Sequence, residues 1–294
     1  MPLDTTKIQL PKSVVTRLAG KVQGTSVIAA LSPAQPQIFA DDTTMIFNPT
    51  AEAEVVAEGA KKGSYEQKLT PVVGKRFKVA TTTRVSNELK WADEDNQLEI
   101  ISNIMNDQAA ALGRALDYVV FHAINPYDGE ALSGFTALTS GAKTVTATND
   151  AVADIDSMID AIIDYNITGI GLARQFTNDL RKVRADGTGQ RLYPEIPLNL
   201  KVGNFDGIPA ATSNTVDGVL ADTKTNVLAI MGDFGLIKWG MVRDIWSEII
   251  EYGDPDGTGN DLKAYNQIAY RTEAVFSYAV LDASGFAVLK GAGE

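Results

Sequence analysis

Cysteine is absent from this chain of 294 residues, and histidine occurs once, as His122. Without cysteine the chain cannot form disulfides, use a thiol nucleophile or bind a metal through thiolates. A single histidine does not make a zinc site, and as a general base it would need an orienting acid and a nucleophile, which no spacing here supplies. We therefore interpret His122 as a helix-end or interface residue, and we expect no enzyme activity.

Signatures of nucleotide-binding and hydrolytic enzymes are missing as well. No dinucleotide fingerprint or nucleophile elbow occurs, and Gly187-Thr188-Gly189 is not followed by the Lys-Ser/Thr of a phosphate-binding loop. The run 254–260 superficially resembles a calcium loop, but its twelfth position is Tyr265 instead of glutamate. We interpret that run as a solvated turn, and we expect no metal and no cofactor.

Long apolar runs are also absent. No run approaches the roughly 18 residues that cross a membrane, and Met1-Pro2-Leu3-Asp4 has neither the basic nor the apolar part of a signal peptide. We therefore expect no membrane contact. The missing cysteines fit assembly in a reducing cytoplasm.

The charge is unevenly distributed around a formal net value of −11. Residues 1–90 carry 12 basic and 8 acidic side chains, whereas residues 91–294 carry 14 basic and 29 acidic ones. Two interpretations stay open. The asymmetry reflects chance and solubility, or the basic segment lies on an acidic neighbour such as another copy of the chain.

The most regular pattern runs from about Asn96 to Ala123 and predicts one long α-helix. Asp93, Glu94 and Asp95 suit the positive end of its dipole, and Asn125-Pro126 ends it. The helix would be roughly 40 Å long, so other elements must lie along its apolar face. Steps of three and four place these residues on that face: Leu98, Ile101, Met105, Ala109, Leu112, Leu116, Val119 and Ala123.

Shorter patterns predict the other elements. The long C-terminal strands are expected to cover the apolar face of the helix at Leu112 and Leu116, with residues 286–289 closing their sheet, and residues 129–236 are expected to form a mixed α/β unit. Strands are predicted at 26–31, 43–48, 144–148, within 227–239, and at 243–250, 268–281 and 286–289; helices are predicted near 11–24, 86–89, 150–164 and 174–185.

Residues 50–85 predict a long β-hairpin that turns at 59–64. Its tip is charged and has few large apolar residues, and isolated hairpins are marginal in water, so we expect it to rest on another surface. The basic run 75–78 is less suited to nucleic acid, because it lies in a hairpin of an acidic protein. The candidate assembly-interface residues are Glu58, Lys61, Lys62, Lys68, Lys75, Arg76, Lys78 and Arg84.

The order of these parts resembles the major capsid protein of tailed bacteriophages, which has the Hong Kong 97-like fold. Ala53–Gly59 is similar to the family's entry into its extended loop, and Val85–Leu89 to the lead-in to its long spine helix. Gly207–Pro209 and Met231–Phe234 resemble the axial domain and the strand that leaves it. Arg271–Leu289 resembles the C-terminal strands of the peripheral domain, so the likeness covers nearly the whole chain.

The resemblance implies an α+β fold with a defined layout. It places an N-terminal arm at 1–45, an extended β-hairpin loop at 46–82 and an axial α/β domain at 129–236. The peripheral domain would comprise 83–128 and 237–290, with the spine helix at about 96–123. Copies would form hexamers and pentamers that tile an icosahedral shell around double-stranded DNA, without sequence-specific binding to it.

The resemblance also implies partners. The chain would act in the virion capsid, assembled in the host bacterial cytoplasm, with separate scaffolding and portal proteins and with or without a decoration protein. A separate scaffold is expected because the chain starts at Met1 almost directly with the arm. Lys61, Lys62 and Lys68 lie in the loop that cross-links some members to an asparagine, but neither the asparagine nor a catalytic acid can be assigned, so we expect no cross-link.

Two other functions are weighed against this one. An encapsulin-like protein compartment shares the fold but packages enzymes, and no cargo-docking signature is visible. A hydrolase with its site in 129–236 is disfavoured by the lack of a usable histidine or cysteine.

Overall fold

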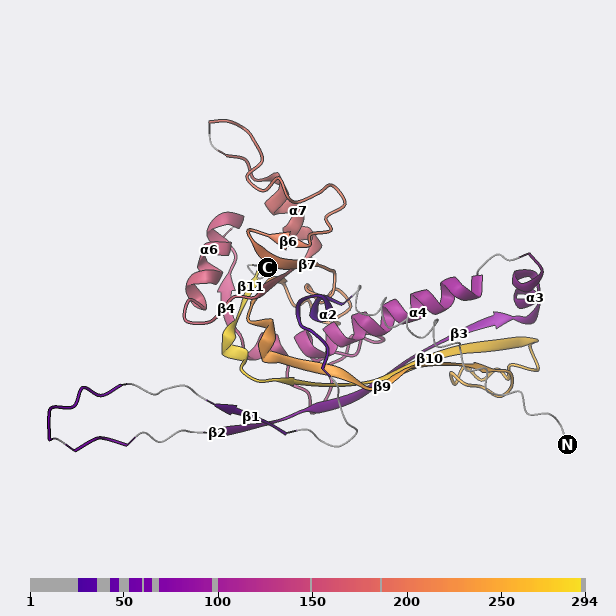
Figure 1. Cartoon of the computed structure of the whole chain (residues 1–294). Coiled ribbons are helices and arrows are strands. Elements are labelled where there is room, and N and C mark those ends of the chain that lie inside the picture. The colour runs from indigo at the N-terminus through magenta and orange to yellow at the C-terminus, as the bar shows by residue number, and fades with distance from the viewer. Residues whose placement is uncertain are drawn as a thin grey trace.

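The computed structural model describes residues 26–35, 43–47, 53–59, 61–64, 69–96, 100–148, 150–185 and 187–291. Figure 1 shows an elongated base, an α/β unit that stands on it and a hairpin that projects from one end. The described helices are α2 (Val27–Leu31), α3 (Asn87–Asn96), α4 (Ile100–Asp117), α5 (Leu138–Gly141), α6 (Ala151–Ala161) and α7 (Arg174–Lys182), with the π-helical turn η1 (Tyr118–His122) and the 3-10 turns η2 (Phe234–Leu236) and η3 (Ala283–Gly285).

The strands form three sheets within the described part of the chain. The strands are β1 (Thr43–Phe47), β2 (Leu69–Val73), β3 (Lys75–Ser86), β4 (Lys143–Thr146), β5 (Gly169–Leu172), β6 (Asn204–Phe205), β7 (Ile208–Thr212), β8 (Val227–Gly232), β9 (Ile237–Ile250), β10 (Gln267–Val280) and β11 (Phe286–Lys290). Their orders are β1-β2, β3-β10-β9 and β4-β11-β8-β5-β7-β6. This α+β architecture agrees with the predicted class.

The base consists of the antiparallel sheet β3-β10-β9 with α4 lying along it. Leu112 and Leu116 are buried in the main hydrophobic core, as predicted from the spacing of the apolar residues. Gln108 adds a polar anchor, because its side-chain amide donates to the Tyr270 carbonyl at 3.0 Å and accepts from the Thr272 hydroxyl at 2.6 Å. The helix is therefore fixed to the central strand of the sheet by both apolar and polar contacts.

The long helix differs at both ends from the single helix predicted over 96–123. The acidic run belongs to α3, a separate helix, yet Asp93 still accepts a hydrogen bond from the Ile101 backbone N–H at 3.2 Å in the first turn of α4. At the other end the helix widens into η1, and Ala123 stops it with a left-handed φ of 52°. Leu98, which the spacing places on the apolar face, and the predicted helix near 11–24 lie outside the described residues.

The α/β unit is built on the six-stranded sheet, with α6 contacting β4 and β11, and α7 contacting β8. The predicted strand at 286–289 exists as β11, but the prediction that it closes the sheet of the long strands is wrong. β11 pairs antiparallel with β8 and parallel with β4. Its residues 286–289 are completely buried, as expected for a strand that lies between two others inside a covered sheet.

Two of the crossings that join the base to the α/β unit lie together. β8 leads to β9 through η2, and β10 leads to β11 through η3. An aspartate caps each turn: Asp233 accepts from Gly235 N–H at 2.9 Å, and Asp282 accepts from Ser284 N–H at 2.8 Å. The Asp233 N–H also donates to the Gly285 carbonyl at 3.2 Å, so the two crossings are hydrogen-bonded to each other.

The segment predicted as a strand at 26–31 is instead the helix α2. Ser26 caps it by accepting from the Ala29 N–H at 3.2 Å. The decisive partner is Asp117 at the end of α4, whose carboxylate accepts from the backbone N–H groups of Val27 at 2.9 Å and Ile28 at 3.2 Å. A carboxylate satisfies the free N–H groups of a helix start, and this one comes from 90 residues away.

The hairpin also differs from the predicted 50–85. Its paired arms are β1 and β2, with Thr43 opposite Val73 and Phe47 opposite Leu69. The basic strand β3 is not an arm of the hairpin, because it pairs along its whole length with β10 in the base. The predicted strand at 43–48 is thus confirmed as β1. The second arm, predicted to run to residue 85, is too long, because the observed arm β2 ends at Val73.

The first prediction concerns the contact between α4 and the base. Leu112→Ala or Leu116→Ala should lower the free energy of unfolding by roughly 2–5 kcal/mol, because each deletion leaves a cavity in a packed core. Urea denaturation of the unassembled subunit measures this loss. Asp107→Ala, at an exposed position of the same helix, is the control and should change it by less than about 0.5 kcal/mol. Equal stability of all three variants would contradict the packing.

The second prediction concerns the pH dependence of stability through Asp117. Burial raises the pKa of its carboxyl from 3.8 to about 6, against the opposing effect of the hydrogen bonds from Ser26, Thr215, Val27 and Ile28. The folded chain then takes up a proton at higher pH than the unfolded chain. The stability contributed by this titration is fully present below about pH 4 and is lost as the pH rises through 6.

Asp117→Asn keeps the shape but removes the titration. The stability of the wild type relative to this variant should therefore fall by about 2–3 kcal/mol between pH 4 and pH 7, since one pKa unit corresponds to ~1.4 kcal/mol. Urea unfolding of both proteins at several pH values measures the difference. A constant offset across that range would show that Asp117 does not titrate there.

Candidate assembly interface

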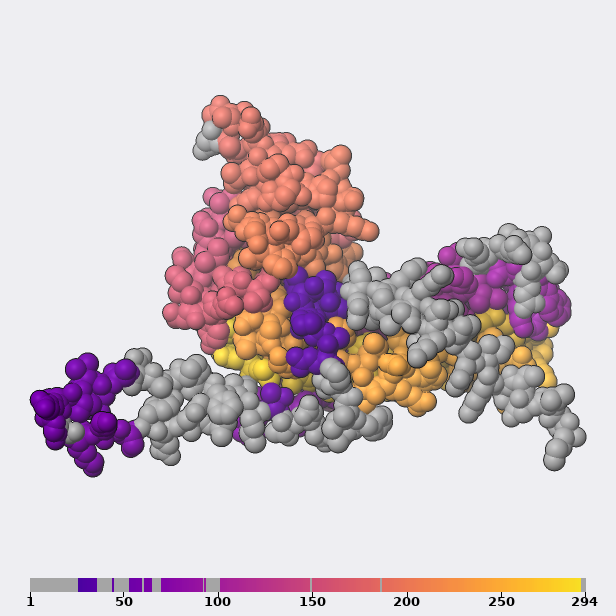
Figure 2. All heavy atoms as spheres, in the orientation of Figure 1, coloured from indigo at the N-terminus to yellow at the C-terminus, as the bar shows by residue number. Residues whose placement is uncertain are grey.

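The tip of the hairpin stands clear of the rest of the subunit. Residues 53–59 and 61–64 lie beyond β1 and β2, away from the body (Figures 1 and 2). Almost every described side chain there is exposed, including that of Val55 at 100%. The two sides are tied by one hydrogen bond, from the Gly63 N–H to the Glu54 carboxylate at 2.8 Å. The tip thus has little packing of its own.

Three of the predicted interface residues lie at this tip. Glu58, Lys61 and Lys62 are exposed, and the turn between them uses Gly59 with a φ of +80°. None of the three forms an ion pair with another described residue. Lys68 is outside the described part of the chain. The charges of the tip are therefore available to another molecule.

The other predicted residues lie on β3, an edge strand of the base. Lys75 is exposed and Arg76 is half-buried. Lys78 is engaged within its own subunit, because its Nζ lies 2.6 Å from the Glu273 carboxylate and 5.6 Å from the centre of the Trp246 ring. The structure thus separates the basic residues of the tip from those of the sheet, which the sequence alone placed together.

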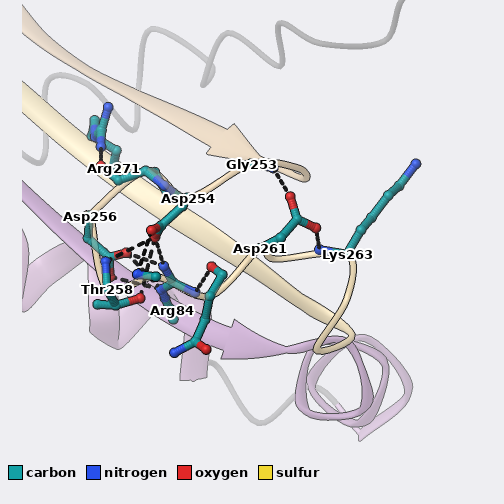
Figure 3. A network of polar contacts seen from close by, with 11 residues as sticks. Arg84, Gly253, Asp254, Asp256, Thr258, Asp261, Lys263 and Arg271 are labelled. Atoms are coloured by element: carbon teal, nitrogen blue, oxygen red, sulfur yellow. Dashed lines mark hydrogen bonds and ion pairs between the residues drawn. The ribbon is translucent and has the colours of Figure 1, made fainter.

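Arg84 is the most completely engaged of these residues (Figure 3). Its guanidinium donates to the carboxylates of Asp254 and Asp256 and, at 2.9 Å, to the Asn260 carbonyl. The guanidinium also holds the pKa of Asp256 down to about 2. Arg84 therefore fastens the loop between β9 and β10 onto β3.

The same loop was predicted to be a solvated turn, and its ordering is what the sequence did not reveal. Asp254 also accepts hydrogen bonds from the Thr258 N–H at 3.1 Å and from the Gly259 N–H at 2.7 Å. The acidic side chains thus surround a guanidinium, in the arrangement that the calcium-like spacing suggested for a cation. Arg84 lies 170 positions before Asp254, and no local motif in the sequence connects the two.

His122 is the last residue of η1 and packs inside the fold. Its Nε2 lies 3.0 Å from the Thr215 carbonyl, and burial lowers its pKa. Its position matches the interpretation of a helix-end residue. Among the residues that the structure describes, no group of three histidine, cysteine or acidic side chains is placed to hold a metal ion, and no helix is long and apolar enough to pass through a bilayer.

A projecting hairpin, a long helix along a three-stranded sheet and a separate α/β unit are the parts expected of a shell protein. Residues 8–291 match the model of the phage capsid family. The chain belongs to the phage capsid family. It is a major capsid protein, a structural component of the virion shell and not an enzyme, and its mixed α+β fold is of the Hong Kong 97 type.

Solved structures support this assignment. A chain of Mycobacterium phage Ogopogo is 35% identical, with a TM-score of 0.81, over 91% of this chain and 92% of that one. A chain of Gordonia phage Cozz is 30% identical, with a TM-score of 0.76, over 92% and 87%. The capsid of an empty GTA particle computed with C5 symmetry shares the fold, with a TM-score of 0.60, 15% identity and coverage of 92% and 90%. None of the curated proteins matches the chain.

The third prediction concerns the charges of the tip. Lys61→Glu combined with Lys62→Glu should leave the subunit folded but reduce the yield of shells, because the tip would then repel an acidic neighbour. Each exposed pair contributes only about 0–1 kcal/mol and is screened by salt, so wild-type assembly should also weaken as salt rises. Sedimentation measures the yield, and circular dichroism checks folding.

Lys263→Glu combined with Lys224→Glu makes the same change of charge at exposed positions outside the hairpin and serves as the control. A normal yield from the tip variant, with no effect of salt on the wild type, would mean that the charge asymmetry is incidental.

Proposed function

We propose that this capsid protein assembles as hexamers and pentamers into an icosahedral shell that encloses the double-stranded DNA genome of a tailed bacteriophage. The observation that carries the proposal is the hairpin, whose tip is almost wholly exposed on the isolated subunit. A two-stranded hairpin is marginal in water by itself. A neighbouring subunit provides the surface that would stabilise it.

The proposed layout follows the sheets. The sheet β3-β10-β9 with α4 is the peripheral domain, and the six-stranded sheet with α6 and α7 is the axial domain. The predicted boundaries of 83–128 and 237–290 for the former and 129–236 for the latter then change, since β11 belongs to the axial sheet and β3, which starts at Lys75, belongs to the peripheral one. Within the predicted arm at 1–45, the helix α2 packs inside its own subunit. The part of the predicted arm before α2, and the part of the predicted loop at 46–82 that precedes β3, would reach neighbouring subunits.

The charge of the body suits a container that later releases its DNA. Residues 91–294 carry 29 acidic and 14 basic side chains, so an inner surface made from them would repel phosphates. We propose that scaffolding and portal proteins, with or without a decoration protein, act with the chain during assembly, and that its contact with DNA is independent of base sequence.

The fourth prediction tests assembly and contents together. The chain is expressed in bacterial cells, alone and with the scaffolding protein of the same phage, and particles are examined by size-exclusion chromatography and negative-stain electron microscopy. We expect closed shells or capsomers, the rings of subunits from which shells are built. Shells from infected cells should contain double-stranded DNA, measured as nuclease-protected nucleic acid.

Two results would contradict the proposal. A monomer that stays inert under all conditions, including with its scaffold, would remove the assembly function. Shells from infected cells that contain enzymes and no DNA would instead indicate a protein compartment.

A further inference from the structure

Two arginines face each other on a projection of the α/β unit. Arg184 and Arg191 oppose each other as an isolated antiparallel bridge, next to a backbone hydrogen bond of 2.9 Å from Ala185 to Gln190. This small hairpin follows α7 and forms the end of the molecule furthest from the base in the views of Figures 1 and 2. The outer side of this small hairpin points away from the rest of the subunit.

Like charges directly opposite on an antiparallel pair are destabilising, and neither arginine forms an ion pair with a carboxylate among the residues that the structure describes. Large apolar side chains are exposed in the same segment, Leu192 at 42% and Leu198 at 78%. We call Arg184, Arg191, Leu192, Leu198 and the exposed Lys201 the basic projection.

A complementary surface lies on α6 and the turn that follows it. Asp156, Ile159, Asp160, Ile163 and Asp164 are spaced by three and four residues along one side, and we call them the acidic face. Ile159 is 36% exposed and Ile163 is 69% exposed. None of the three aspartates pairs with a basic side chain in the part of the chain that the structure describes. The acidic face thus combines unpaired negative charge with exposed apolar area.

We propose that the basic projection of one subunit docks on the acidic face of the next copy in the same capsomer. The inference rests on the proposed function and names the surfaces that would make the ring. Charge and apolar area match on both sides: arginines and lysine against aspartates, leucines against isoleucines. The two surfaces occupy different places on the subunit (Figure 1), as a head-to-tail contact that closes a ring requires.

The fifth prediction reverses each surface and then both. Arg184→Glu/Arg191→Glu should reduce shell yield at least tenfold while the subunit stays folded, because two negative surfaces would meet. Asp156→Arg/Asp160→Arg should do the same with two positive surfaces. The chain with all four changes should return to within about threefold of the wild-type yield, since complementarity is restored with the signs exchanged.

A matched control separates local complementarity from total charge. Arg184→Glu/Arg191→Glu combined with Asp244→Arg/Glu251→Arg restores the same net charge, but it does so at exposed positions on β9 and just after it, so it should not restore assembly. Yield is measured by sedimentation, and folding by circular dichroism, for every variant at one low salt concentration.

The outcomes distinguish this inference from the proposed function. If wild-type shells form and either double variant assembles normally, or if the fourfold variant remains as poor as the doubles, the docking of these two surfaces is wrong and the shell function stands. Equal rescue by the β9 control would also overturn the docking. If the wild type itself forms no capsomers or shells, both proposals fail.

Discussion

The buried carboxylate of Asp117 is the interaction on which the centre of the subunit depends. It lies where α4 passes into η1, and its oxygens accept hydrogen bonds from Ser26, Val27, Ile28 and Thr215, which belong to the start of α2 and to the segment between β7 and β8. One side chain thus fixes the end of the long helix, a short N-terminal helix and part of the α/β unit. A fully buried carboxylate is costly unless its acceptor positions are filled, so the three segments must be in place together.

Four basic residues among those described in the first third of the chain lie in two different settings. Arg84 and Lys78 hold the base together, through the loop after β9 and through Glu273. Lys61 and Lys62 remain exposed on the tip. Among the described residues, the basic charge of the sequence thus contributes to folding where β3 meets its own sheet, and it stays exposed at the tip of the hairpin.

The sequence predicted correctly those features that depend on the spacing of residues within a single helix or strand. The apolar stripe with Leu112 and Leu116 located the packed side of the helix, and the alternation along β10 identified a strand, because each is a repeat set by one element. Residues 26–31 were misassigned because α2 is capped by Asp117, and a hydrophobic run of that length suits a strand or a helix equally. β11 was assigned to the wrong sheet for a related reason: periodicity shows that a strand is buried but not which partner covers it. In the candidate interface the exposed tip was predictable from its polarity, whereas the pairing of Arg84 with Asp254 and Asp256 depends on a contact across 170 residues.

The paired crossings between the base and the α/β unit have a mechanical consequence. The chain passes from β8 to β9 and from β10 to β11, and the Asp233 N–H to Gly285 carbonyl hydrogen bond holds these two passages together. A third passage leads from α4 through η1 to α5. Twisting one unit against the other would therefore deform several backbone segments at once, and a load between the units is shared by separate lengths of covalent backbone.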